Sequence, residues 1–477
     1  MRTRTRRVVG IVAVALTLAT TSACEVPDHL VENWVQRWPA VTSSEGRWFV
    51  DHVGRVVLLR GVNEVYKSPP YHPAAEGFGD DDAAFLAERG FNVVRLGVSF
   101  MALMPEPGVV DAGYVTAIEG SVQALSRHRI HAILDFHQDG YGPLTHGNGM
   151  PAWATLTDGL PNPDVPFPAY YVQNPALQRA FDNFWANREV EGVGLQDHYA
   201  HAAGELARRL ARYRWVLGYE AMNEPWPGTD WTACATGCPD LEADLLVPFY
   251  ERFDTAVRAW DADAIVMYEP FVLFNFGHTD TTLPRIGPNG ALAPHVYALS
   301  PEEDASVIAR SVAAGDASGQ AVVIGEFGAT NDRATLERQA GQLDDGLLSW
   351  AFWAYNENMV WNQHQPPGPG NMVESTMAAL TRPYPRLTDG TPLELAFDPV
   401  TRTMTNRYST TRPDGSQGDR GLSAYEVPAT VFPDGYSVDV VGGRVRSAPC
   451  APVLIVEAAK GGAEVSVTVT PGGDCAA

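Results

Sequence analysis

Short apolar runs alternate with amphipathic stretches between residues 56 and 355. Eight of the runs have the length and composition of buried strands: Val56–Asn63, Asn92–Ser99, His131–Gln138, Trp215–Glu224, Ala264–Glu269, Ala291–Tyr297, Ala321–Gly328 and Leu347–Tyr355. The clearest helical stretch is Leu241–Trp260, where large apolar residues recur at steps of three and four: Leu246, Phe249, Phe253, Val257 and Trp260. Strand and helix repeated eight times predict an α/β fold, a (β/α)₈ TIM barrel. A doubly wound sheet is the alternative, but no Gly-rich phosphate loop follows the first strand.

The pattern changes after the Pro-rich stretch Pro383–Pro392. Five short strand-like runs follow, with Pro-Asp-Gly and Gly-Gly turns between them: Thr401–Tyr408, Ala424–Phe432, Tyr436–Val445, Pro452–Ala459 and Ala463–Thr470. We therefore expect a catalytic-type barrel over 24–382 and a small C-terminal β-sandwich over 390–477, which we interpret as a structural brace rather than a carbohydrate-binding module.

The N-terminus has the features of an export signal. Four arginines within the first seven residues precede the apolar stretch Val8–Ala19, and small residues lead up to Cys24. The stretch is shorter than the roughly 20 residues of a membrane span. We expect a signal peptide over 1–23 and a secreted protein. A lipoprotein anchored at Cys24 is the alternative, although Thr21 stands where such signals usually carry Leu.

Composition narrows the function classes. The chain has 477 residues, with 57 acidic and 34 basic side chains and a formal charge of −23. This balance argues against a nucleic-acid partner, which requires a basic face, and against electrostatic docking on anionic lipid. Apart from Cys24 there are four cysteines, which allow three pairings. Pairing within each neighbourhood, Cys234 with Cys238 and Cys450 with Cys475, is the simplest, and no metal ligands stand near the first pair.

Polar residues cluster at the C-terminal ends of the predicted strands, where barrel enzymes place their active sites. They are Arg95, His137, Asp139, Asn223, Glu224, Glu269, His295, Tyr297, Glu326 and Trp353. The strongest signals are Asn223-Glu224-Pro225 after the fourth strand and Gly325-Glu326-Phe327-Gly328 at the seventh. Two carboxylates at one barrel mouth suit hydrolysis of an acetal, in which one acts as acid and the other attacks the anomeric carbon.

The neighbours of the two glutamates suggest their roles. Asn223 can hold a sugar 2-hydroxyl while Glu224, which must arrive protonated, faces the scissile oxygen. Arg95 and Tyr297 are expected beside Glu326 and would keep it ionised as the nucleophile. A separation of about 5–5.5 Å would mean retention of configuration. Two carboxylates and water complete this chemistry, so we expect no metal and no organic cofactor.

Other strand-end residues have plainer interpretations. Glu220 is expected to be structural, and Glu269, before Pro270, to be a wall residue. A metal site of His137, Asp139 and His295 is the alternative to sugar binding, but the His-x-His pattern of barrel metallohydrolases is missing from the first strand. Trp353 at the eighth strand's end is a natural stacking platform for a pyranose. We expect Arg95 and His295 to contact the sugar as well.

These residues stand in the order seen in glycoside hydrolase family 5, and within it the chain resembles the endoglycoceramidases. The resemblance covers about 45–380 and the C-terminal sandwich. It rests on four segments: Arg60-Gly61-Val62-Asn63, Tyr66-Lys67-Ser68-Pro69-Pro70-Tyr71, Asp135-Phe136-His137-Gln138-Asp139 and Ala221-Met222-Asn223-Glu224-Pro225. It implies cleavage of the β-linkage between oligosaccharide and ceramide in glycosphingolipids.

The resemblance also assigns residues. It implies Glu224 as acid/base and Glu326 as nucleophile. It further implies that the sugar beside the cleaved bond is held by Lys67, His137, Asp139, Asn223 and Tyr297. Lys67 gains interest because it is the only lysine in the predicted barrel. We expect a monomer.

Three apolar segments after predicted strands are candidate ceramide contacts: 100–104, 271–276 and 359–361. Transient contact with a lipid or micelle surface would then be apolar. The alternative is that these segments pack against each other or against the sandwich. An endo-β-glucanase or β-glucosidase of the same family, acting on soluble substrates, is the alternative enzyme. A non-catalytic glycolipid-binding protein is the alternative outside enzymes.

Overall fold

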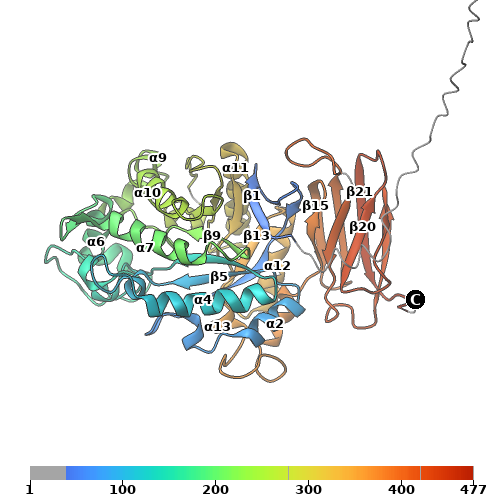
Figure 1. Ribbon diagram of the computed structural model, residues 1–477, viewed down its shortest axis with the longest axis horizontal. Helices are drawn as coiled ribbons and strands as arrows, with labels where there is room; N and C mark the ends of the chain where they lie inside the picture. The colour runs from blue at the N-terminus through green and yellow to red at the C-terminus, as the bar shows by residue number, and fades with distance from the viewer. Residues whose placement is uncertain (1–38, 278, 419–420, 476–477) are drawn as a thin grey trace, which may run out of the picture.

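A computed structural model describes residues 39–277, 279–418 and 421–475. Eight parallel strands close into a barrel, so the predicted fold is confirmed (Figure 1). In chain order these strands are β4 (Arg60–Glu64), β5 (Val93–Val98), β6 (His131–Phe136), β9 (Val216–Glu220), β10 (Ile265–Tyr268), β11 (Gly290–Leu292), β12 (Ala321–Ile324) and β13 (Ser349–Phe352). Nearly all their residues are buried, as expected for parallel strands covered by helices outside and side chains inside.

Helices surround the barrel. The longer ones are α2 (Asp80–Glu88), α4 (Ala112–Arg127), α6 (Pro175–Trp185), α7 (Leu195–Leu210), α10 (Val247–Arg258), α11 (Pro301–Ser318), α12 (Arg333–Asp345) and α14 (Glu374–Leu380). Short helices in the connections are α3 (Phe100–Leu103), α5 (Tyr170–Gln173), α8 (Trp231–Cys234), α9 (Pro239–Leu241) and α13 (Tyr355–Asn358). Single 3₁₀ turns lie at η1 (Pro73–Ala75), η2 (Pro143–Thr145), η3 (Ala152–Ala154), η4 (Gly228–Asp230) and η6 (Val272–Phe276). The hairpin β7 (Glu189–Val190) and β8 (Val193–Gly194) precedes α7.

The predicted helix Leu241–Trp260 is present but differs at its ends. It runs from α9 through a π-helical turn, η5 (Glu242–Leu246), into α10. Phe249, Phe253 and Val257 are buried as their spacing indicates, but Trp260 is 54% exposed. Its placement on the buried face was wrong because α10 has ended at Arg258 and the helical spacing no longer applies.

Two antiparallel sheets form the second region (Figure 1). The first has the order β1-β2-β3-β14-β17-β20-β19, with β1 (Val41–Glu45), β2 (Trp48–Asp51), β3 (Val56–Val57), β14 (Tyr384–Thr388), β17 (Leu422–Glu426), β20 (Val453–Ala458) and β19 (Gly443–Val445). The second has the order β15-β16-β21-β18, with β15 (Thr391–Asp398), β16 (Thr403–Ser409), β21 (Glu464–Pro471) and β18 (Tyr436–Val441).

The N-terminal strands therefore belong to the accessory sheet. The predicted single strand Val56–Asn63 is in fact two, since β3 pairs with β14 and β4 enters the barrel. Strands β1 to β3, which the sequence grouped with the barrel, hydrogen-bond into the same sheet as residues beyond 383. This pairing joins segments more than 300 residues apart, which no local pattern reveals.

Three other boundaries also differ from the predictions. The Pro-rich stretch Pro383–Pro392, which separates the two predicted domains, forms β14 and the start of β15. Its prolines are tolerated because both strands shift register beside them, and β15 is an edge strand. The predicted strand Tyr436–Val445 is divided between β18 and β19 in different sheets. The run Ala424–Phe432 leaves its strand after Glu426.

The seven-stranded sheet packs on both faces. In β20, Ile455 packs with barrel residues such as Ile133 and Met267, whereas its neighbours Leu454 and Val456 pack with the four-stranded sheet. This alternation is the two-residue period of a strand buried on both sides. The sheet thus closes the end of the barrel opposite to the strand C-termini, and the mouth of the barrel stays clear of the sandwich.

Both expected disulfides are present, Cys234–Cys238 and Cys450–Cys475. Within the part of the chain that the structure describes, none of the helices combines the length and the apolar character needed to cross a membrane. The predicted signal peptide 1–23 and Cys24 lie outside the described residues.

Candidate active site

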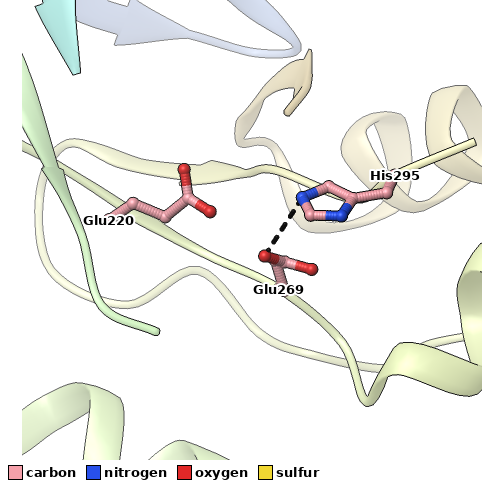
Figure 2. A group of neighbouring side chains, drawn as sticks. All are labelled: Glu220, Glu269 and His295. Atoms are coloured by element: carbon pink, nitrogen blue, oxygen red, sulfur yellow. Dashed lines mark ion pairs between the residues drawn. The ribbon is translucent and has the colours of Figure 1, made fainter. Parts of the chain in front are cut away.

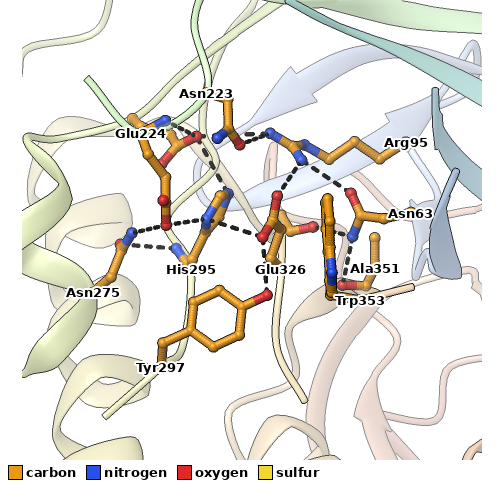
Figure 3. A network of polar contacts seen from close by, with 12 residues as sticks. Asn63, Arg95, Asn223, Glu224, Asn275, His295, Tyr297, Glu326, Ala351 and Trp353 are labelled. Carbon is orange, nitrogen blue, oxygen red and sulfur yellow. Dashed lines mark hydrogen bonds and ion pairs between the residues drawn. The ribbon is translucent and has the colours of Figure 1, made fainter. Parts of the chain in front are cut away.

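Two glutamates face each other at the C-terminal end of the barrel. Glu224 follows β9 and Glu326 follows β12, and both approach Nδ1 of His295 (Figure 3). Glu224 Oε1 lies 3.0 Å from that nitrogen and Glu326 Oε2 lies 3.6 Å from it. The separation of these two oxygens cannot exceed the sum of the two distances, which lies at the lower end of the roughly 6.5–9.5 Å typical of inverting pairs. The geometry favours a retaining pair.

Glu326 receives two strong donors. Arg95 Nη1 donates to Oε1 at 2.7 Å, and the Tyr297 hydroxyl donates to Oε2 at 2.9 Å. Burial, and then the nearby carboxylates Glu326 and Glu224, hold the pKa of Tyr297 well above its usual value, so its hydroxyl keeps the proton it donates. Both oxygens of Glu326 are thereby fixed as acceptors, the state that a carboxylate nucleophile requires.

Arg95 is the centre of the network. Its Nε and Nη2 donate to Glu220 at 2.8 and 2.7 Å, and it also donates to Asn63 and Asn223. Burial alone would lower the pKa of Arg95, but the carboxylates of Asp135 and Glu220 outweigh burial and hold that pKa above its usual value. Glu220 is thus a structural partner, as its position indicated.

Arg95 and His295, predicted to contact the sugar, contact protein carboxylates instead. Both side chains are completely enclosed, and their polar atoms face protein carboxylates. They reach a substrate only through the glutamates that they hold. Asn223 is also occupied, because its Oδ1 accepts from Arg95 at 2.8 Å and its Nδ2 donates to the Gln138 carbonyl at 3.0 Å.

Glu224 is held from three sides. Asn275 Nδ2 donates to its Oε1 at 3.2 Å, beside His295 Nδ1, and its main-chain N–H donates to Glu269 Oε1 at 3.1 Å. Its φ of 43° is in the left-handed region, which is uncommon for residues other than glycine. Burial would lower the pKa of His295, but Glu269 and Glu326 outweigh it and raise that pKa well above its usual value.

The remaining predicted residues form a second group at the mouth. Lys67 Nζ lies 2.7 Å from Asp139 Oδ2 and 4.3 Å from the ring centre of Trp353. His137 stacks on Trp353 with ring centres 5.4 Å apart, and its Nδ1 lies 2.7 Å from Asp135 Oδ2. Burial lowers the pKa of His137, but Asp135 and Asp139 outweigh it and raise that pKa to about 9. This arrangement presents an ammonium, an imidazolium and a carboxylate, groups suited to sugar hydroxyls.

Among the described residues, one group of three side chains is close enough together to hold a metal ion. It consists of Glu220, Glu269 and His295, whose ligand atoms lie within 4.8 Å of one another (Figure 2). Arg95 Nη2 lies 2.7 Å from Glu220 Oε1 and 3.7 Å from Glu269 Oε1. The positive charge that a cation would bring to these carboxylates is already supplied by the guanidinium. His137 and Asp139, weighed as ligands with His295, instead contact Asp135 and Lys67.

The sequence interpretation missed three members of this network. Asn63 is the penultimate residue of β4, as Asp135 is of β6, so the same search of strand ends that found Arg95 could have found them. Asn275 donates to Glu224 from within the apolar run 271–276, where it is the only polar residue. Glu269, expected to be a wall residue, contacts the backbone of Glu224.

Most residues of the three apolar segments 100–104, 271–276 and 359–361 do not line a lipid-binding groove. Phe100, Leu103 and Met104 are buried, as are Phe271, Phe274, Met359 and Val360. They pack in the main core, which was the alternative considered for them. Trp361 is the exception, because it is 64% exposed on the loop after α13.

Comparison with known proteins agrees with this geometry. Residues 50–359 match the family described as cellulase (glycosyl hydrolase family 5), and residues 382–469 match the glycoside hydrolase family 5 C-terminal domain. The chain is 33% identical over 469 residues to endoglycoceramidase I of Rhodococcus hoagii, covering 91% of this chain and 89% of that protein.

Two solved structures of endo-glycoceramidase II from a Rhodococcus species are also similar. One, described as a lactosyl-enzyme intermediate, has 28% identity and a TM-score of 0.73, covering 90% of this chain and all of that chain. The other, a complex with ganglioside GM3, has 26% identity and a TM-score of 0.70, covering 89% of this chain and 99% of that chain. With both family matches in place, the chain belongs to glycoside hydrolase family 5.

Proposed function

We propose that this protein hydrolyses the β-glycosidic bond between the oligosaccharide and the ceramide of glycosphingolipids, releasing the intact glycan and ceramide. The observation that carries the proposal is the pair Glu224 and Glu326 facing one nitrogen of His295. The endoglycoceramidases similar over both regions of the chain support this choice of substrate.

The reaction proceeds in two steps with retention. Glu224 protonates the oxygen that leaves with ceramide while Glu326 attacks the anomeric carbon, forming a glycosyl-enzyme bond. Glu224 then takes a proton from water, which attacks that carbon and releases the glycan with Glu326 restored. Arg95 and Tyr297 hold Glu326 for attack. Lys67, His137, Asp139 and Trp353 surround the sugar beside the cleaved bond.

The test is incubation of purified residues 24–477 with a ganglioside, without added metal, followed by mass spectrometry. We expect intact oligosaccharide and free ceramide. Glu326→Ala should abolish turnover. Glu224→Ala should lower turnover by about 10²–10⁴-fold. Added azide should restore the cleavage of an activated aryl glycoside by this variant. Stepwise loss of terminal sugars, or activity only on soluble glucans, would contradict the proposal.

We further propose that Trp361 contacts the lipid or micelle surface. It is an exposed aromatic on a loop at the barrel mouth, where the ceramide must leave. Trp361→Ala should lower turnover of micellar substrate several-fold and leave a soluble aryl lactoside unaffected. Trp260→Ala is the matched control, because Trp260 is also exposed but precedes β10 at the opposite end of the barrel. Equal losses on both substrates would refute the contact.

We propose that the protein is exported as a monomer after removal of 1–23. The basic and apolar N-terminal segments support export, as does the presence of two disulfides. The intact mass of the exported chain distinguishes a free Cys24 from a lipid-modified one, and light scattering gives the oligomeric state.

A further inference from the structure

Glu269 is a buried carboxyl group that the two-step reaction does not use. It follows β10, has no exposed surface, and lies among Glu220, Arg95 and His295. Burial raises the pKa of Glu269 to about 8, which the nearby His295 opposes. A buried ionisable group costs stability unless its contacts compensate, so the contacts of Glu269 indicate its purpose.

The first contact is with the backbone of Glu224. Glu269 Oε1 accepts the main-chain N–H of Glu224 at 3.1 Å. The left-handed conformation of Glu224 is strained for a residue with a side chain and persists only where its surroundings hold it. The carboxyl of Glu269 satisfies the buried donor in that conformation, which directs the Glu224 side chain toward His295.

The second contact is with the ring of His295. Nε2 lies 3.2 Å from the same oxygen of Glu269, while Nδ1 lies 3.0 Å from Glu224 Oε1. Both ring nitrogens thus face carboxyl oxygens, the arrangement in which both carry protons. Glu224 Oε1 then accepts from His295 Nδ1 and from Asn275 Nδ2. With Oε1 engaged as an acceptor, the transferable proton belongs on Oε2.

We propose that Glu269 is a positioning residue for acid catalysis: by holding the Glu224 main-chain N–H and the His295 ring, it keeps Glu224 Oε1 as an acceptor and leaves Oε2 to protonate the departing oxygen. The inference rests on the proposed role of Glu224 as acid/base. In this role Glu269 does not contact the substrate. The effect of Glu269 on the rate therefore depends on how much protonation the leaving group needs.

The test is a leaving-group series of aryl β-lactosides, from dinitrophenyl to phenyl, with wild type, Glu269→Leu and Glu269→Gln. Leucine removes the acceptor, so we expect a loss of about 10²–10³-fold on phenyl lactoside and less than about tenfold on dinitrophenyl lactoside, with KM little changed. Glutamine keeps a carbonyl acceptor and should restore much of the loss. An equal loss on all substrates would mean a merely structural role and would overturn the inference.

Two further variants keep the test decisive. Glu242→Gln is the matched control, since Glu242 is also a buried glutamate but accepts from Thr281 and Thr282 away from the site. It should leave the leaving-group dependence unchanged. If Glu269→Leu fails to fold, the effect of Glu269→Gln is measured both in the wild-type protein and in the Glu224→Ala variant. An effect of Glu269→Gln that persists without Glu224 would refute action through Glu224, whereas an inactive wild type would refute the proposed function itself.

Discussion

Arg95 shows how one side chain sets the geometry of the whole site. Its guanidinium contacts Glu220 through two nitrogens and reaches Glu326 and Asn223 with the remaining donors. A planar fork of donors can serve several acceptors at fixed angles, and a lysine ammonium cannot. Arg95 thus holds both Glu326, the proposed nucleophile, and Asn223, which precedes the proposed acid/base Glu224.

We predict that Arg95→Lys destabilises the fold by about 3–5 kcal/mol, because several enclosed acceptors lose their partner. It should also lower kcat by at least about 10²-fold, since Glu326 loses its alignment. Denaturant unfolding and steady-state kinetics measure the two effects. Arg208→Lys, at an exposed pair with Glu205, should change stability by less than about 1 kcal/mol. Wild-type kcat in Arg95→Lys would contradict this account.

At the scale of elements, the structure joins α2 to α13 through a buried carboxyl group. Asp82 accepts from the Gly79 N–H at 2.9 Å and from the Tyr355 hydroxyl at 2.6 Å. Burial raises the pKa of Asp82 to about 6. The folded state therefore binds this proton more tightly than the unfolded state, so the stability from it is present below about pH 4 and is lost as pH rises through 6.

We predict that Asp82→Asn removes this pH dependence. Between pH 4 and 7 the free energy of unfolding of the wild type should fall by up to about 3 kcal/mol relative to the variant. This is the free energy that corresponds to a rise of about two units in the pKa of Asp82 on folding. Free energies of unfolding at both pH values test the difference. Asp81→Asn, at the neighbouring exposed position, is the control, and its free energy of unfolding should change with pH as that of the wild type does. A constant offset between wild type and Asp82→Asn would show that Asp82 does not titrate in this range.

Strand ends explain why much of the site could be predicted. In a parallel barrel all C-terminal ends meet at one mouth, so polar residues ending apolar runs converge whatever their separation in sequence. Arg95, Asn223, Glu224 and Glu326 could be predicted on this basis. Asn275 could not, because it lies in a connection whose path depends on packing.

At the scale of the whole molecule, the barrel and the sandwich share a hydrophobic cluster at the base of the barrel. The seven-stranded sheet packs Phe49, Leu387 and Ile455 against barrel residues such as Met267. Strand β3, encoded before the barrel, pairs with β14, encoded after it. The accessory region is therefore packed against the catalytic barrel, and its interpretation as a brace stays a prediction.

We predict that a chain ending at residue 381 fails to fold. It loses β14 and every later strand and exposes the apolar base of the barrel, a cost exceeding the roughly 5–15 kcal/mol by which a domain is stable. Soluble yield, circular dichroism and lactoside hydrolysis are the measurements. A chain ending at Cys475 keeps β21 whole and the Cys450–Cys475 disulfide intact, and it should fold and retain activity. An active, monomeric 1–381 variant would show that the barrel is independent of the sandwich.

The sequence by itself determined the barrel, the sandwich and the two carboxylates, because these follow from local periodicity and from where apolar runs end. The tertiary structure alone decided which residues touch. It showed that Arg95 and His295 support carboxylates, that Glu269 holds the backbone of Glu224, and that most apolar loop residues are core. Such contacts depend on chain paths across the barrel, and linear spacing carries no information about the distance between two side chains on different strands.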